Sequence, residues 1–217
     1  MRVKKIIKSI VFFFLNYFFY LRPYPTKGVI LMYHSIGENN LFFNVQPDDF
    51  IRQMEYLKKK KFRVITLSQL VELLRKKQSI SQKTVVLTLD DGYQDNYSNV
   101  WPVLKKYGFP ATIFLVPDLI DQRIGDSQNI VLDMLTWPEI REMHQSGLID
   151  FEPHSLTHQV LSQINLEQAE KEIKESKEVI EKRLNKVCYF FAYPRGNFNE
   201  KVISVLKRVG FIAGLTL

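Results

Sequence analysis

Two short segments of the chain carry side chains that could bind a divalent metal and move a proton. Residues 88–92 read Thr-Leu-Asp-Asp-Gly and place two adjacent carboxylates at the end of an apolar run, while residues 154–158 place two imidazoles four positions apart. Two nitrogen ligands and one oxygen ligand suit zinc and related cations, and one carboxylate would remain to act as a base. These residue types predict a metal-assisted hydrolase.

The adjacent carboxylates Asp90 and Asp91 can serve one site only if the strand ends at them, because neighbouring strand side chains point to opposite faces. Gly92 provides the turn. Two carboxylates held close together push their pKa values apart, which favours one metal ligand and one general base. The alternative is a helix cap followed by a solvated acid.

His154 and His158 are spaced to lie one helical turn apart, with both rings on one face. Pro153 suits a loop that leads into a first helical turn, so the spacing predicts a short helical segment here. The alternative is a pair of polar residues on an exposed turn. An acidic strand end elsewhere in the chain favours the metal-binding interpretation.

A third segment, residues 191–199, combines an apolar strand with a Pro-x-Gly turn. Backbone N–H groups exposed in such a turn could stabilise an oxyanion. Taken alone, the segment is a common strand–turn–helix junction.

The elements that must position these side chains alternate along the chain. Predicted strands cover residues 29–33, 63–65, 84–89, 111–116, 148–151 and 189–193, and residues 210–217 read as the start of another. Predicted helices cover residues 47–60, 67–76, 98–107, 137–145, 166–184 and 200–209. The alternation predicts an α/β fold with a parallel sheet covered by helices, in which functional groups gather at the C-terminal ends of strands. Asp90, Asp91, His34 and Pro194 all fall at such ends.

Length and composition narrow the function further. The chain has 217 residues, enough for one domain, and a formal net charge of +7 spread over several segments. This dispersed charge favours anionic envelope polymers or lipid head groups and, without a compact basic stripe, no nucleic acid. The only cysteine, Cys188, excludes an intramolecular disulfide and is expected to be buried.

The N-terminus departs from this pattern. Basic residues precede an apolar run over residues 10–21, which predicts a signal anchor and linker over residues 1–24 and a catalytic domain over 25–217. The run is shorter than the ~20 residues that span a bilayer, so an interfacial or buried helix is the alternative. The anchor would tether the protein to the membrane in the cell envelope, with the domain extracytoplasmic, or secreted if the segment is cleaved.

Five motifs, at residues 32–35, 87–93, 109–114, 154–158 and 191–196, resemble the polysaccharide deacetylases, carbohydrate esterase family 4, with the NodB-type homology domain. The likeness is greatest to the short, membrane-associated branch. It implies a distorted, incomplete (β/α) barrel that removes acetyl groups from an N-acetylglucosamine-containing polysaccharide or glycoconjugate. It also implies a metal held by Asp91, His154 and His158, with Asp90 as general base. That ligand set suits Zn²⁺ best, with Co²⁺, Ni²⁺ or Mn²⁺ as alternatives.

The chain departs from the family pattern at three points. Ala192 stands where the family has an arginine that orients the base, and Arg195 stands where it has a tyrosine. Arg195 would still offer a backbone N–H to an oxyanion. The family's final strand, with its Leu-x-His segment, would follow Leu217, so the domain is expected to lack that strand. His34 is the candidate for proton transfer or substrate binding, with a structural role as the alternative.

Two other functions fit parts of this pattern. A catalytically impaired sugar-binding relic of the same fold would explain the missing final strand and the absence of an arginine at Ala192, but the presence of all three metal ligands and of Asp90 argues against it. A non-haem iron oxygenase also uses two histidines and one carboxylate. Its usual antiparallel fold disagrees with the strand–helix alternation.

Overall fold

The computed structural model describes residues 28–39, 41–125 and 131–216. The predicted anchor and linker lie outside these residues. Within the described part of the chain, no helix has both the length and the apolar character needed to cross a membrane.

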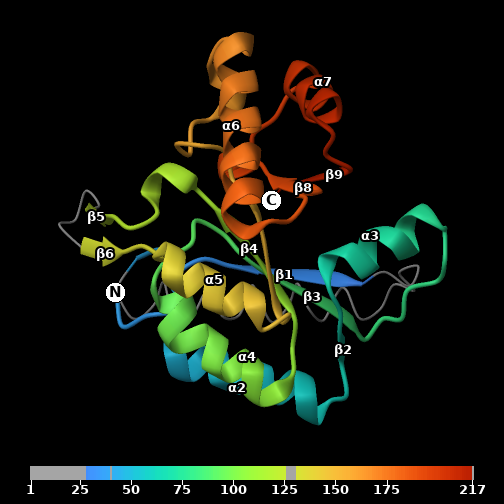
Figure 1. Ribbon diagram of the computed structural model, residues 1–217. Coiled ribbons are helices and arrows are strands. Elements are labelled where there is room, and N and C mark those ends of the chain that lie inside the picture. The colour runs from blue at the N-terminus through green and yellow to red at the C-terminus, as the bar shows by residue number, and fades with distance from the viewer. Residues whose placement is uncertain (1–27, 40, 126–130, 217) are drawn as a thin grey trace, which may run out of the picture.

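The fold is α/β, as predicted, and its centre is a parallel sheet (Figure 1). Strand β3 pairs along one edge with β1 and along the other with β2 and β4, and β4 pairs in turn with β7. All six residues of β3 are buried, as expected for a strand covered on both faces. The bounds of these strands are Val29–Tyr33 (β1), Arg63–Val64 (β2), Thr84–Leu89 (β3), Ala111–Leu115 (β4) and Ile149–Pro153 (β7).

Among the described residues, four further strands lie outside the central sheet. Strands β8 (Phe190–Ala192) and β9 (Ala213–Leu215) pair with each other in parallel. Strand β9 lies within residues 210–217, where the sequence predicted the start of a strand. The antiparallel pair β5 (Arg123–Gly125) and β6 (Val131–Asp133) was not predicted. Among the described residues the strands thus fall into three sheets, and β8 lies next to β7 without pairing with it.

The predicted helices form within a few residues of their expected bounds. Helices α2, α4 and α5 gather on one side of the sheet, and α6 and α7 lie side by side on the other (Figure 1). The bounds are Pro47–Lys59 (α2), Leu67–Arg75 (α3), Trp101–Tyr107 (α4), Trp137–Gln145 (α5), Leu166–Leu184 (α6) and Glu200–Val209 (α7). Short helical turns η1 to η4 cover Asn96–Val100, Pro117–Leu119, Leu161–Gln163 and Pro194–Gly196.

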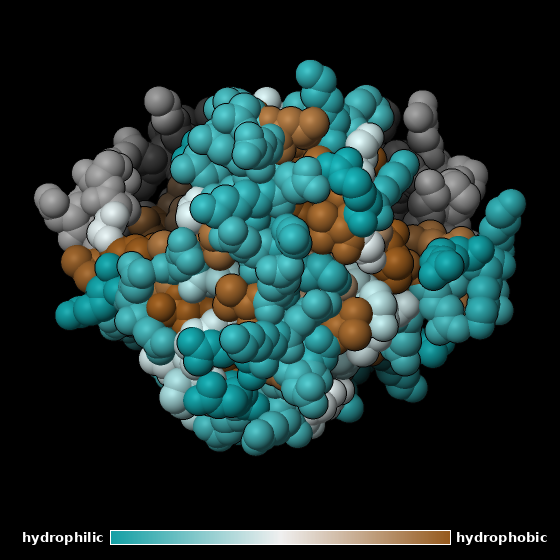
Figure 2. Space-filling model, turned by 45° about the horizontal axis from the view of Figure 1, so that its top comes forward, coloured by the Kyte–Doolittle hydropathy of each residue, from teal (hydrophilic) through white to brown (hydrophobic). Residues whose placement is uncertain are grey.

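Local sequence signals fix the helix ends. Thr66 and Thr136 form capping boxes with Gln69 and Glu139, so each threonine accepts from the third helical N–H while the partner side chain accepts from the cap. Gly108 ends α4 in the left-handed conformation, which costs a glycine little. On the face seen in Figure 2, hydrophilic side chains predominate and hydrophobic ones form separate patches.

Candidate metal and catalytic site

The two carboxylates lie where β3 ends, as the sequence predicted. The Asp90 N–H donates to the backbone oxygen of Tyr33 on β1 at 2.9 Å, which carries the sheet pairing one residue past the strand. Asp91 then takes a left-handed conformation with φ 72°, and Gly92 follows with φ 81°. This reversal turns both carboxylates into the same cleft.

Gly92 is required for a second reason besides its backbone angle. A Cβ atom at this position would lie 2.8 Å from Cδ2 of Leu115, a side chain of β4 that is fully buried. The turn therefore packs directly on the neighbouring strand, and only glycine fits.

The two histidines come together, but not through the predicted helical turn. His154 follows the end of β7, with its N–H donating to Leu115 O at 2.7 Å, and residues 154–159 are not helical. Ser155 and His158 take positive φ values of 62° and 64°. The prediction of a helix here was wrong because two left-handed residues fold the segment into a tight loop instead.

The loop between the histidines is held by α6. Glu172 accepts the N–H groups of Leu156 and Thr157 at 2.9 and 2.8 Å and the Thr157 hydroxyl at 2.7 Å. The His158 N–H donates to the Ser155 hydroxyl at 2.9 Å. These bonds satisfy backbone N–H groups that helical hydrogen bonds would otherwise satisfy, so the loop is held in place without regular secondary structure.

Asp91 and the two histidines form a compact ligand set. Nε2 of His154 and of His158 lie 3.6 and 3.3 Å from Oδ1 of Asp91, and the three candidate ligand atoms lie within 4.8 Å of one another. That Asp91 oxygen is buried and accepts no hydrogen bond from the described residues. A buried carboxylate oxygen facing two imidazole nitrogens fits a divalent cation, which would satisfy all three.

Charge states in the site follow from burial. Burial lowers the pKa of His154 to about 4 despite the nearby Asp91 carboxylate, so this imidazole is neutral and can offer a lone pair. Burial, with a smaller contribution from Asp91, raises the pKa of Asp90 to about 8. Asp90 therefore holds a proton far more tightly than an ordinary aspartate.

The other two predicted residues line the same cleft, which has a volume of about 870 Å³. The ring centroids of His34 and Phe43 lie 5.2 Å apart. Burial lowers the pKa of His34. Arg195 is exposed at the other side of the cleft, with φ 56° in the turn after β8. The structure thus places Asp90, Asp91, His34, His154, His158 and Arg195 around one cavity.

Several residues that contribute to the cleft have no signal in the sequence. Phe43 forms a wall, stacked on Tyr93 with ring centroids 6.0 Å apart. The backbone oxygen of Ala192 lies 2.8 Å from Nδ1 of His154. Only the chain fold brings these groups to the site, because each comes from a segment far from its partner in sequence.

Comparison with known proteins agrees with this geometry. The polysaccharide deacetylase family profile matches residues 77–214. The Bacillus subtilis protein YxkH is 33% identical over 192 residues, covering 88% of this chain and 65% of its own length. The poly-β-1,6-N-acetyl-D-glucosamine N-deacetylase of Staphylococcus epidermidis is 31% identical over 183 residues, covering 81% of this chain and 62% of its own length.

A solved structure is similar over a larger share of its length. The Streptococcus pyogenes deacetylase PplD, in complex with acetate, superposes with a TM-score of 0.79 at 30% identity, covering 89% of this chain and 85% of that one. The chain spans less than two thirds of the length of the two curated relatives above. By its family profile and its fold, the chain belongs to the polysaccharide deacetylase family.

Proposed function

We propose that the protein is a metal-dependent hydrolase that removes N-acetyl groups from an N-acetylglucosamine-containing polysaccharide or glycoconjugate. The observation that carries the proposal is the convergence of Asp91, His154 and His158 on one point, with Asp90 in the same cleft. Family membership supports it, as does the activity for which the staphylococcal relative is named.

Asp91, His154 and His158 would hold the cation. When bound, a divalent cation supplies Lewis-acid polarisation of the acetyl carbonyl and lowers the pKa of water. Zinc suits two imidazoles and a carboxylate best, and cobalt, nickel or manganese could replace it.

Asp90 would act as the general base. It takes a proton from the water that adds to the acetyl carbon. The carbon–nitrogen bond then breaks to release acetic acid, and Asp90 returns that proton to the sugar nitrogen, which leaves as an amine. A positive charge held by Asp91 and the histidines would lower the pKa of Asp90 and ionise it for this task. The turn at Pro194 and Arg195 would place a backbone N–H near the developing oxyanion.

The remaining cleft residues would bind the sugar. His34 carries a lowered pKa and is neutral near pH 7, so we assign it a hydrogen bond to substrate rather than the role of a strong acid. The half-exposed face of Phe43 suits the apolar face of a pyranose ring. We further propose that residues 1–24 anchor the protein to the membrane of the cell envelope.

The test measures acetate release and bound zinc in the full-length protein with acetylated glucosamine oligomers as substrate. His154→Ala should lose both, whereas the matched variant His144→Ala, on α5 and outside the cleft, should keep both. Unchanged acetate release by His154→Ala would refute the assignment. If the unmodified protein binds stoichiometric zinc but releases no acetate, the enzyme assignment fails and a sugar-binding protein of the same fold is favoured instead.

A further inference from the structure

A buried carboxylate, Glu152, joins β7, the strand that leads into His154, to β8, the strand that bears Ala192. Glu152 lies on β7 and is fully buried. Its Oε2 accepts the backbone N–H groups of Tyr189 and Phe190 at 2.9 Å each. Strand β7 pairs with β4 and β8 pairs with β9, so these two bonds make a link that the sheet ladders do not supply.

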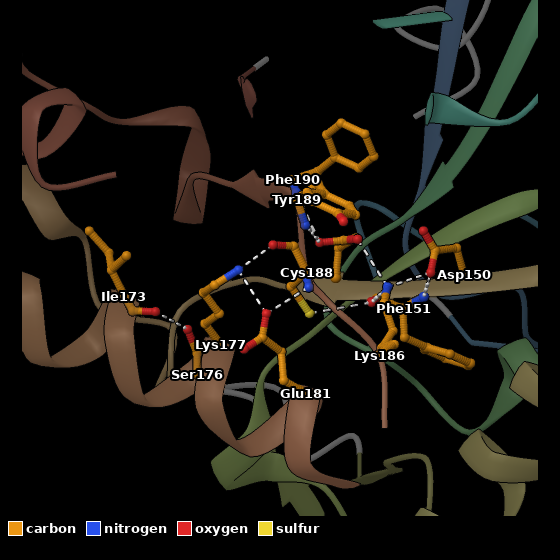
Figure 3. A network of polar contacts seen from close by, with 11 residues as sticks. Asp150, Phe151, Ile173, Ser176, Lys177, Glu181, Lys186, Cys188, Tyr189 and Phe190 are labelled. Atoms are coloured by element: carbon orange, nitrogen blue, oxygen red, sulfur yellow. Dashed lines mark hydrogen bonds and ion pairs between the residues drawn. The ribbon is translucent and has the colours of Figure 1, made fainter. Parts of the chain in front are cut away.

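The carboxylate is paired on its other oxygen. Lys186 Nζ lies 3.0 Å from Oε1 of Glu152, 2.6 Å from the oxygen of Phe151 and 2.5 Å from Asp150, and its side chain is only 12% exposed. Figure 3 shows Lys186 beside Phe151 and Asp150. A buried carboxylate needs such a partner, since an uncompensated charge in the interior is costly. Residues 186–190, which lead into β8, are therefore held to β7 at both ends. The Lys186 ammonium binds Glu152 at one end, and the N–H groups of Tyr189 and Phe190 bind it at the other.

The link between β7 and β8 lies next to His154, one of the proposed metal ligands. Glu152 and His154 both contact β8, Glu152 through the N–H of Phe190 and His154 through the backbone oxygen of Ala192. His154 places Nδ1 2.8 Å from the backbone oxygen of Ala192, two residues beyond the Phe190 N–H that Glu152 holds. A carbonyl oxygen only accepts, so this contact puts the ring proton on Nδ1 and leaves Nε2 free to face Asp91.

We propose that Glu152 is a positioning residue: with Lys186 it sets the distance between β7 and β8, and so fixes the tautomer and orientation of His154 for binding a metal. The inference rests on the proposed function only in taking His154 as a ligand. Outer partners of ligating histidines typically change metal affinity about 10–100-fold when they are removed.

A matched control lies on the opposite side of the same segment. Glu181 on α6 accepts the Cys188 N–H at 2.8 Å and pairs with Lys177 at 2.8 Å (Figure 3). Glu181→Gln removes one carboxylate charge from this segment without touching β7. It tests whether any loosening of residues 186–190 has the same effect.

The experiment measures the zinc Kd by competition with a chelator and the ¹⁵N shifts of the His154 ring in the metal-free, full-length protein. For Glu152→Gln we expect a Kd raised about 10–100-fold and a mixture of His154 tautomers. For Glu181→Gln we expect a Kd within about threefold of the unmodified protein and the Nδ1–H tautomer alone. Glu152→Asp, which keeps the charge but shortens the side chain, should shift both readouts in the same direction and serves if the Gln variant does not fold.

The two proposals fail in different ways. If the unmodified protein binds no zinc, the proposed function fails. If it binds zinc and folded Glu152→Gln or Glu152→Asp matches Glu181→Gln in both Kd and tautomer, only the positioning role of Glu152 is overturned.

Discussion

Nδ1 of His154 donates to the backbone oxygen of Ala192 at 2.8 Å, and this one contact decides which nitrogen of the ring faces Asp91. Ala192 contributes its main chain to the site, so the short side chain at this position does not prevent it from orienting a metal ligand. The site thus depends on backbone groups that a motif comparison does not report.

Substitution of Asp90 by Asn separates proton transfer from metal binding. The amide keeps the shape of the carboxylate but cannot take a proton from water, so acetate release should fall about 10²–10⁴-fold. Zinc content should be unchanged, because Asp90 lies outside the ligand set of Asp91 and the histidines. Both quantities are measured on the same preparation, and a parallel loss of zinc would show that Asp90 is itself a ligand.

The pKa of Asp90 also makes a prediction about stability in the metal-free protein. The ordinary value is 3.8, and burial raises it to about 8 in the folded chain. Between these values the unfolded chain releases a proton that the folded chain keeps, so the stability contributed by this group is lost as the pH rises from about 4 to about 8. The free energy of unfolding, measured with denaturant at about pH 5 and about pH 8, should decrease less between these pH values for Asp90→Asn than for the unmodified protein. Equal decreases in the two proteins would contradict the raised pKa.

Phe43 tests how the cleft binds sugar. Phe43 is 39% exposed, and its ring packs against the rings of Tyr93 and His34. Phe43→Ala removes this face and should raise KM for acetylated oligomers about fivefold, as ~1 kcal/mol of lost contact implies, with little change in kcat. Phe43→Tyr keeps the ring and serves as the control. A fall in kcat with KM unchanged would place Phe43 in the chemistry instead of in binding.

Cys188 is fully buried, as expected from its apolar neighbours, and burial raises the pKa of its thiol. Neither a thiolate nor access is available in the folded state. Labelling by a disulfide reagent should therefore proceed only as fast as the protein unfolds, and should accelerate in denaturant. Rapid stoichiometric labelling in native buffer would show that the segment before β8 opens locally.

The sequence predicted the fold better than the details of the site. The apolar run of β3 and the Asp-Asp-Gly turn are local signals, and the strand ends where they indicate. The helical spacing of His154 and His158 was misleading, because Ser155 and His158 adopt left-handed backbone angles. The loop that contains them is held by N–H groups that donate to Glu172 on α6, far away in the sequence. Glu152 could not be recognised as a link between strands, since its partners lie 37 and 38 residues away along the chain.

Gly92 limits how a protein of this design could diversify. Any side chain there would collide with Leu115 and also strain the backbone, so no single substitution relieves both problems. Substitutions that change which substrate the cleft accepts are therefore expected at its exposed rim. Phe43 and Arg195 lie there, face solvent and are not part of the turn that positions the carboxylates.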